Sequence, residues 1–370
     1  MTASKDVDVI VVGGGAVGLF LGCRLAQLGL SCRVLERRAE PTPHSRAIGI
    51  HPPALELLAE LGVAEAFLRE GVRVTRGHAF AGTRRLGTLE FSACRPPYRF
   101  ILTLPQPRTE AILAARLREL APEALTLGAE VAGLKVGAEG VTVTLVGGDT
   151  LRAHYLVAAD GKESRVRHLL GIPFGGGPYP DTYLMGDFTD TTTLGSDAGL
   201  YFTHAGLVES FPLPGGVRRW VAKTPGFVTE PTPELLGELV AERLGAPLPL
   251  ATNTMLSAFG VQRFLAGRFV SGRAALIGDA AHVLSPIGGQ GMNLGWLGAW
   301  RLADSLAAGT GLTGYAAHRR TARRAIRRAE FNTVMGRASP VAPLRDAFAW
   351  SILHTPARRV FAAAFTMRGL

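Results

Sequence analysis

The N-terminal end of the chain carries the apolar spacing of a strand, a helix and a second strand. Val7 to Val12 is a short, nearly all-apolar run that ends in glycines, which indicates a strand buried on both faces of a parallel sheet. Apolar residues then recur at helical spacing from Leu19 to Leu28, and Gly29 ends this pattern. Cys32 to Leu35 has the pattern of the next strand. The sequence therefore predicts a βαβ unit.

Strand-like and helical segments alternate after this unit. Val72 to Phe91 has a strand-like pattern with turns expected at Gly82 and Gly87, and Thr109 to Leu120 returns to helical spacing. Short apolar runs then predict a small β-meander that caps the first sheet: Leu125 to Leu127, Glu130 to Val136, Val141 to Leu145 and Leu151 to Ala158. The chain is thus expected to leave one sheet and return to it.

The second half of the chain adds further strands and helices. Thr182 to Lys223 is expected to contain three or four strands, with a helix over Pro233 to Leu244 that crosses them. Ala274 to Ile277 is another apolar strand. The remaining pattern predicts helices over Gly291 to Leu306, Tyr315 to Met335 and, with breaks at Pro343 and Pro356, Pro340 to Leu370.

The charge of the chain raises the question of an anionic partner, because the formal net charge is +10 and the sequence pI is about 10.1. No nucleic-acid-binding motif accompanies the arginines, so we expect no nucleic-acid partner. A basic helix face is expected, since two sets of arginines repeat every four residues: Arg319, Arg323, Arg327 and Arg320, Arg324, Arg328. A solvated surface is the preferred interpretation, and weak contact with a membrane surface or an acidic partner is the alternative.

The sequence has no features of a membrane span or of a disulfide framework. Its apolar stretches are far shorter than the roughly 20 residues that a spanning helix needs, and no charged-then-apolar leader opens the chain. Cys23, Cys32 and Cys94 form no C-x-x-C pair, which argues against disulfides, a zinc site and a redox-active dithiol. We expect a soluble, cytoplasmic protein without a metal site.

A glycine-rich turn follows the first expected strand. Gly13-Gly14-Gly15-Ala16-Val17-Gly18 fits G-x-G-x-x-G between a strand and a helix, and Glu36 follows the second strand. Gly13 permits the tight turn, Gly15 lets the backbone approach a pyrophosphate, and Gly18 permits close helix packing. The pyrophosphate would lie at the positive end of the helix dipole, while the Glu36 carboxylate would accept ribose hydroxyls and repel a 2′-phosphate. This segment favours FAD or NAD over NADP.

A second segment, far along the chain, decides between FAD and NAD. The strand Ala274 to Ile277 leads into Gly278 and Asp279, whose carboxylate at a strand end suits a ribityl hydroxyl. Pro286 to Asn293 then forms a glycine-rich loop that runs into a helix, where backbone N–H groups can approach a ring closely. The N-terminus of that helix would stabilise negative charge on a reduced flavin. We therefore expect FAD.

Three motifs follow one another along the chain: Gly13-x-Gly15-x-x-Gly18, Asp160-Gly161-x-x-Ser164-x-Val166-Arg167 and the segment from Gly278-Asp279 to Asn293. Taken in this order, they resemble the FAD-dependent aromatic hydroxylases of the para-hydroxybenzoate hydroxylase type, which include polyketide hydroxylases and rifampicin monooxygenase. The resemblance runs to about Met335 and includes Arg46 and Gln106. It implies that Arg46 and Gln106 contact FAD, that Asp160-Gly161 lies near the flavin and nicotinamide sites, and that Asp279 binds the ribityl chain.

The motifs and the resemblance together give the residues that we expect to bind the cofactor. They are Gly13, Gly15, Ala16, Gly18, Glu36, Arg37, Arg46, Gln106, Asp160, Gly278, Asp279, Pro286, Gly289, Gly291, Met292 and Asn293.

The resemblance also implies an activity. NADH or NADPH would reduce FAD, O2 would add to form a flavin hydroperoxide, and its terminal oxygen would pass to an aromatic or polyketide-like apolar substrate. No second G-x-G-x-x-G is found, which argues against a separate NAD(P)H domain. Two positions depart from the family, which usually has an aspartate and then an asparagine where Gly298 and Arg301 stand here. The thioredoxin-like third domain of larger members is expected to be absent, which implies a two-domain member.

The predicted fold class is α/β, with a Rossmann-like FAD-binding domain, an interleaved β-rich substrate domain and C-terminal helices. We assign residues 1–72, 99–172 and 267–335 to the FAD-binding domain, 73–98 and 173–266 to the substrate-binding domain, and 336–370 to a C-terminal helical segment. Two other functions stay open: a flavin-dependent reductase or dehydrogenase of the geranylgeranyl reductase type, and a non-catalytic flavin-binding protein.

The sequence identifies no catalytic acid or base. His51, His204 and His282 could handle protons, but a histidine is more often hydrogen-bonded in a structural role. Four aromatic residues of the expected strands could line an apolar pocket, although core positions are the preferred interpretation: Tyr201, Phe202, Phe211 and Trp220.

Overall fold

The apolar run near the start of the chain lies in the centre of a parallel sheet. In the computed structural model, which describes residues 7–40, 46–337 and 342–369, β1 (Val7–Val12) pairs in parallel with β2 (Cys32–Glu36) and β11 (Thr150–Ala158). β8 (Leu125–Leu127) and β18 (Ala274–Leu276) continue it in the order β18-β11-β1-β2-β8. Counted along the chain, these strands stand in the order of a Rossmann sheet, which confirms the predicted fold class.

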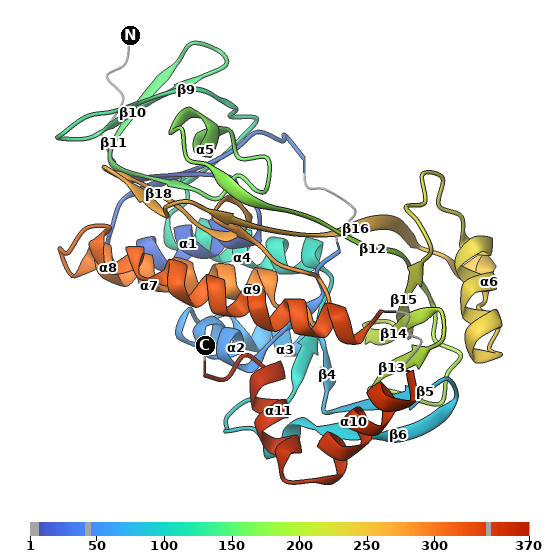
Figure 1. The fold of residues 1–370 in the computed structure, drawn as a ribbon. Helices are drawn as coiled ribbons and strands as arrows, with labels where there is room; N and C mark the ends of the chain where they lie inside the picture. Colours follow the sequence, from blue (N-terminus) through green and yellow to red (C-terminus); the bar gives the residue numbers. More distant parts are fainter. Residues whose placement is uncertain (1–6, 41–45, 338–341, 370) are drawn as a thin grey trace.

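Helices cover this sheet because its central strand is apolar on both faces, and Val9, Ile10 and Val11 have no exposed surface. α1 (Ala16–Gln27) packs against α4 (Gln106–Leu120) and α7 (Gly291–Ala307). Figure 1 shows α7 and α9 (His318–Met335) running along one side of the sheet. The shorter elements of this part are α2 (Pro52–Glu60), α3 (Ala64–Glu70), α5 (Arg165–Leu169), α8 (Thr313–Ala316), β17 (Val270–Ser271) and a small sheet of β3 (Gly49–Ile50), β7 (Ile101–Thr103) and β4 (Val72–Val74).

The expected β-meander is formed by β9 (Val131–Val136), β10 (Val141–Leu145) and the first half of β11. The second half of β11 behaves differently, because it pairs in parallel with β1 and with β18. The prediction of a capping meander is therefore wrong for the last residues of Leu151 to Ala158, which lie inside the main sheet. It is also wrong for Leu125 to Leu127, which pairs in parallel with β2 as the strand β8.

A second sheet lies beside the first and has the strand order β19-β16-β12-β15-β14-β13-β5-β6. Two long strands, β12 (Phe174–Thr189) and β16 (Met255–Ala266), form an antiparallel ribbon that leads from the first sheet toward the second (Figure 1). Helix α6 (Pro233–Leu244) covers the outer face. The other strands are β5 (Arg76–Ala81), β6 (Arg84–Glu90), β13 (Ala198–Thr203), β14 (Gly206–Leu213), β15 (Val217–Thr224) and β19 (His282–Val283).

The C-terminal helices α10 (Ala342–His354) and α11 (Ala357–Phe365) pack against this second sheet at β6. This packing corrects the prediction of a turn at Gly87, which lies within β6, where a Cβ atom would meet the Leu353 side chain at 2.9 Å. The helix predicted over Tyr315 to Met335 is divided between α8 and α9. The Tyr315 hydroxyl donates a 2.8 Å hydrogen bond to the carbonyl of Leu276 and so fixes α8 to the parallel sheet.

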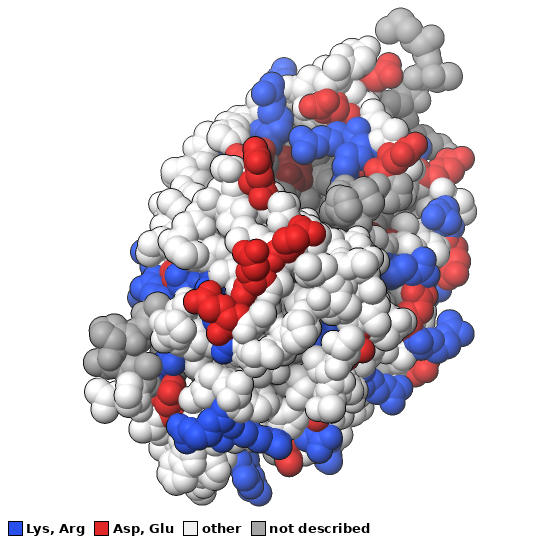
Figure 2. Space-filling model, turned by 90° about the vertical axis from the view of Figure 1, so that its right-hand side faces the viewer, with Lys and Arg blue, Asp and Glu red and all other residues white. Residues whose placement is uncertain are grey.

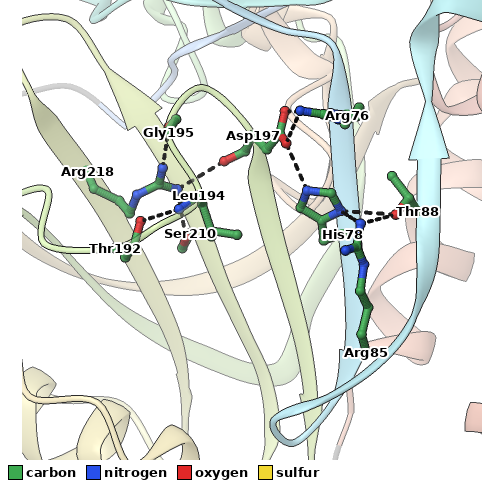
Figure 3. A network of polar contacts seen from close by, with 10 residues as sticks. All are labelled: Arg76, His78, Arg85, Thr88, Thr192, Leu194, Gly195, Asp197, Ser210 and Arg218. Carbon is green, nitrogen blue, oxygen red and sulfur yellow. Dashed lines mark hydrogen bonds and ion pairs between the residues drawn. The ribbon is translucent and has the colours of Figure 1, made fainter.

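A polar network holds the loop before β13 against the outer face of the second sheet (Figure 3). Arg218, which has no exposed surface, donates to the carbonyl of Gly195 at 2.6 Å and to the Ser210 hydroxyl at 2.9 Å. His78 Nε2 lies 2.9 Å from the Asp197 carboxylate. Buried charged groups without partners would destabilise the fold, and these contacts supply the partners. The network therefore has a structural role.

The three cysteines of the chain are buried and free. Burial raises the pKa of the Cys23 thiol to about 12 and that of Cys32 to about 11, which keeps both protonated and unreactive at neutral pH. All three thiols therefore pack inside the fold.

The turn between β1 and α1 allows a test of the packing, because a Cβ atom at Gly18 would collide with the carbonyl oxygen of Gly13. We expect Gly18→Ala to lower the free energy of unfolding by about 1–3 kcal/mol, measured by urea denaturation. The matched control is Gly147→Ala, where a Cβ atom would meet nothing within 4 Å, and a change of less than about 0.5 kcal/mol is expected. Equal stability of both variants would contradict this packing.

Candidate functional site

A cavity of about 560 Å³ lies where the carboxyl ends of β1, β2 and β11 meet. Its wall includes Gly13 and Gly15 of the turn after β1 and Glu36 at the end of β2. Gly13 has a φ of +109°, and a Cβ atom there would collide with the backbone of Ala159. The turn therefore requires glycine, and it leaves backbone groups facing the cavity.

The N-terminus of α1 faces this cavity without a side-chain cap from its N-cap residue, Gly15. The backbone N–H of Ala16 donates to the Glu110 carboxylate at 3.3 Å, and the Gln106 amide donates to the same oxygen at 2.7 Å. Sequence reasoning did not identify Glu110, although it lies four residues after Gln106 on the same helix face. Glu110 thus accepts from one backbone N–H at the N-terminus of α1.

The Glu36 side chain is held in place by its own neighbours. One carboxylate oxygen accepts the N–H of Gly14 at 2.7 Å, and the other accepts the backbone N–H of Arg38 at 3.0 Å and its guanidinium at 2.7 Å. Burial alone would raise the pKa of Glu36, but these hydrogen bonds outweigh burial and lower it. Glu36 is therefore ionised at neutral pH and keeps lone pairs for further donors.

Asp160 follows β11 and lies in the same cavity. Its Oδ2 accepts the N–H of Val166 at 3.1 Å, whereas its Oδ1 is buried and finds no donor within the described residues. Burial raises the pKa of Asp160, and hydrogen bonding from Ser164 and from backbone N–H groups such as that of Val166 only partly offsets this effect. Arg167, from the same motif as Asp160, donates to the carbonyl of Ala280 at 3.2 Å. This contact connects the Asp160 motif to the segment from Gly278 to Asn293.

A second cavity, of about 390 Å³, continues from the first and shares Gly15, Arg46 and Gln106 with it. Residues 286–292 form one wall and residues 46–49 form another. Asn293 joins these walls from behind: its amide donates to the carbonyls of Gly49 and Gly289, both at 2.9 Å, and its oxygen accepts the N–H of His51 at 2.8 Å. The glycine loop is thus fixed before any ligand binds.

The second cavity also contains a helix N-terminus and a carboxylate. The N-cap residue of α7, Gln290, makes no side-chain cap, and a Cβ atom at Gly291 would meet nothing within 4 Å. The Asp279 side chain is open to the cavity, while protein surrounds it on its other sides. Burial raises the pKa of Asp279 to about 6, against the opposing effect of Lys162.

The structure brings the sequence-predicted residues together, although they come from distant parts of the chain. Two of them, Gly18 and Asn293, lie behind the walls and do not line either cavity. The others line one cavity or both: Gly13, Gly15, Ala16, Glu36, Arg37, Arg46, Gln106, Asp160, Gly278, Asp279, Pro286, Gly289, Gly291 and Met292.

A third cavity, of about 140 Å³, adjoins the second and is lined almost wholly by apolar side chains. Phe202 and Phe211 line it from β13 and β14, which corrects the preferred prediction of core positions for these two residues. Tyr201 and Trp220 stack on each other on the opposite face of the sheet, and Trp220 packs in the core beneath α6. Alternation along the strands explains the division.

The three candidate histidines have different surroundings. His51 lines the second cavity, where its Nε2 donates to the carbonyl of Gly288 at 2.9 Å, and burial lowers its pKa to about 4. It is therefore neutral and supports the glycine loop. His282 is fully buried against Phe269, and His204 is exposed in the turn between β13 and β14.

Comparison with known protein families shows to which family the chain belongs. The model of the family described as FAD binding domain matches residues 6–335. The chain belongs to the FAD binding domain family. Its three glycine- and aspartate-containing motifs are the parts of this FAD binding domain that meet at the cavities.

Relatives of this FAD binding domain protein are named as monooxygenases. The rifampicin monooxygenase of Streptomyces venezuelae is 36% identical over 308 residues, which cover 81% of this chain and 64% of the relative. The solved anhydrotetracycline hydroxylase of Streptomyces rimosus has a TM-score of 0.82 and 31% identity, covering 99% of this chain and 77% of that one. The solved p-nitrophenol 4-monooxygenase of Pseudomonas putida has a TM-score of 0.90 at 24% identity and covers 98% of both chains, which shows the shared fold. The chain spans less than two thirds of the length of the rifampicin monooxygenase.

The two positions that depart from the hydroxylase pattern both contact α9. A Cβ atom at Gly298 would lie 2.9 Å from Nε2 of His318, so the glycine makes room for that ring. Arg301 lies 3.4 Å from Nδ1 of His318 and 3.3 Å from the hydroxyl of Thr321. The two departures therefore form one local packing arrangement between α7 and α9.

The charged surface of this FAD binding domain protein is mixed in sign. Helix α6 exposes Glu234, Glu238 and Glu242 at intervals of four residues, and Figure 2 shows acidic side chains in a diagonal row across this side of the molecule. On α9, Arg319 and Arg328 donate to the carbonyls of Ala266 and Gly369, while the arginines between them that remain exposed are Arg320, Arg323, Arg324 and Arg327. Within the described residues, no helix is long and apolar enough to cross a membrane.

The raised pKa of Asp279 predicts how stability depends on pH in protein prepared without FAD. The folded state holds this proton more tightly than the unfolded chain, so ionisation of Asp279 destabilises the fold as the pH rises from about 4 to about 6. We expect Asp279→Asn to unfold at a slightly higher temperature than the wild type above pH 6, since water in the cavity screens the exposed carboxylate, with the difference vanishing below about pH 4. Exposed Asp149→Asn serves as the control and should show no such gain. A difference that does not change between pH 4 and pH 8 would refute the assignment.

Proposed function

We propose that the chain is an FAD-dependent, NAD(P)H-consuming monooxygenase that hydroxylates an aromatic or polyketide-like apolar substrate. The observation that carries the proposal is the continuity of the three cavities. The first two are lined by glycines, carboxylates and helix N-termini, and the third by aromatic and aliphatic side chains. The names of the relatives support the same reaction class.

The residues of the first two cavities fit FAD. Glu36 would accept the ribose hydroxyls of the adenosine, and the N-terminus of α1 would bind the pyrophosphate. Asp279 would accept a ribityl hydroxyl, which satisfies a carboxylate that burial otherwise disfavours. The N-terminus of α7, with its open position at Gly291, would stabilise negative charge at the pyrimidine edge of the ring.

Bound FAD would supply electron transfer from NAD(P)H and activation of O2. The overall reaction converts a substrate C–H, O2, NAD(P)H and a proton into C–OH, water and NAD(P)+. The protein contributes position and exclusion of water. His51 and Asn293 hold the glycine loop rigid, and the apolar walls of the third cavity desolvate the substrate.

We retain the predicted domain boundaries as part of this proposal. The strands at 76–90 and 174–266 belong to the second sheet, which supports a substrate-binding domain over 73–98 and 173–266. The choice between NADH and NADPH as the reductant stays open. A cytoplasmic location and a weak membrane contact through the exposed arginines of α9 stay predictions.

Oxygen labelling tests the proposed reaction. Purified protein loaded with FAD is supplied with NADPH or NADH, a panel of phenols and ¹⁸O2. The masses of the products are then measured by mass spectrometry. We expect a product that contains one ¹⁸O atom and forms with consumption of one NAD(P)H. Product formed equally well without O2 would indicate a reductase, and absence of any NAD(P)H oxidation would indicate a non-catalytic flavoprotein. Either result would overturn the proposal.

A further inference from the structure

A single carboxyl group, that of Glu209, lies at the junction of the second and third cavities. Glu209 lines both cavities from the middle of β14 and is only 5% exposed. Strand alternation puts it on the same face as Leu207 and Phe211, toward the space beside the glycine loop. Among the residues that line the third cavity it is the only acid or base.

Glu209 has no protein partner in the described part of the chain, where no hydrogen bond or ion pair to its side chain is found. Its cross-strand neighbours, Leu200 on β13 and Val221 on β15, are apolar. A buried carboxyl group without a donor destabilises a fold, and burial accordingly raises the pKa of Glu209 to about 7.

The other ionisable groups near Glu209 form no hydrogen bond or ion pair with it within the described residues. Arg219 on β15 binds both oxygens of Asp187, at 2.7 and 2.8 Å, and donates to the carbonyl of Arg46 at 2.9 Å. His51, on the opposite wall, is neutral and bonded to the glycine loop. On β12, burial raises the pKa of the Tyr183 phenol, and Glu209 raises it further.

Arg46 and Asp279 also face the second cavity, but the residues of the third cavity do not include them. Glu209 is thus the one ionisable group, beside the neutral polar side chains of Thr103 and Asn332, that a molecule in the third cavity would meet. In its ionised form the carboxylate only accepts hydrogen bonds, so a ligand there satisfies it by donating a hydrogen.

We propose that Glu209 binds a phenolic hydroxyl of the substrate and orients the substrate ring toward the flavin. The inference rests on the proposed function for the identity of the substrate as an aromatic molecule. In its ionised form Glu209 accepts the hydrogen bond and, when the proton moves, the phenol O–H bond breaks and an O–H bond to Glu209 forms. The electron pair stays on the phenolate oxygen, and this enriches the ring carbons ortho and para to it. No oxidation or reduction occurs in this step.

Binding measurements on the FAD-loaded protein test the proposal without requiring turnover. The probes are 1-naphthol and 1-methoxynaphthalene, which differ by replacement of the donor hydrogen by a methyl group. Their dissociation constants are measured between pH 6 and pH 8.5 from the change in flavin absorbance. For the wild type we expect 1-naphthol to bind about 10- to 100-fold more tightly than its ether above pH 7, since a hydrogen bond to a charged group is involved. The preference should decrease below pH 7 as Glu209 takes up a proton.

Two substitutions at Glu209 and one control complete the experiment. Glu209→Gln keeps the shape of the side chain, and Glu209→Leu covers the case in which the amide variant fails to fold. In both we expect the preference for 1-naphthol to fall to within about threefold and to lose its pH dependence, a signature that a structural role alone would not give. The control Glu238→Gln makes the same change on α6, on the outer face of the same sheet, and should keep the wild-type preference.

The outcomes separate this inference from the proposed function. A wild-type preference and pH profile that persist in Glu209→Gln would overturn the inference, even if ¹⁸O is incorporated into product. Failure of the wild type to bind 1-naphthol more tightly than its ether would also overturn it, as would tighter binding of the cation 1-naphthylmethylammonium. Loss of the preference in the Glu209 variants supports the inference even if no hydroxylation occurs, in which case only the proposed function fails.

Discussion

Close packing of the turn after β1 against the end of β11 is the constraint on which the site depends. A side chain at Gly13 would collide with Ala159, and one at Gly18 would collide with Gly13 itself. This packing brings the ends of β1, β2 and β11 to one edge, so that Glu36 and Asp160 line one cavity although they lie far apart in the chain. The site is therefore a consequence of the sheet order.

The parts of the site that follow strands could be predicted from the sequence. Gly13 and Glu36 stand directly after apolar runs and Asp279 stands one residue further on, and parallel strands end at a common edge. Pattern alone also placed α6 and β10 correctly. By contrast, β11 was misread in part, because one strand serves as the edge of a meander and as a member of the main sheet.

Features that depend on tertiary contacts could not be predicted. The first half of β12 contains Gly175 to Gly177 and two prolines, which do not have a strand pattern. Even so, Phe174 to Pro178 pairs with β16, and the pairing resumes at Thr182 after an irregularity. Glu110 and Glu209 are ordinary acids in the sequence, and only the fold shows one at a helix N-terminus and the other inside an apolar cavity. The division of the aromatic residues between the two faces of the second sheet could likewise be seen only in the fold.

The central claim is that one continuous channel holds FAD and presents its ring to an apolar substrate cavity. A crystal structure of the protein with FAD tests it most directly. The account predicts the adenosine beside Glu36, the ribityl chain at Asp279 and the ring between residues 46–49 and 286–292, with the cavity of Glu209 beyond it. An FAD molecule bound in the opposite direction, or a ring separated from the apolar cavity by protein, would contradict it.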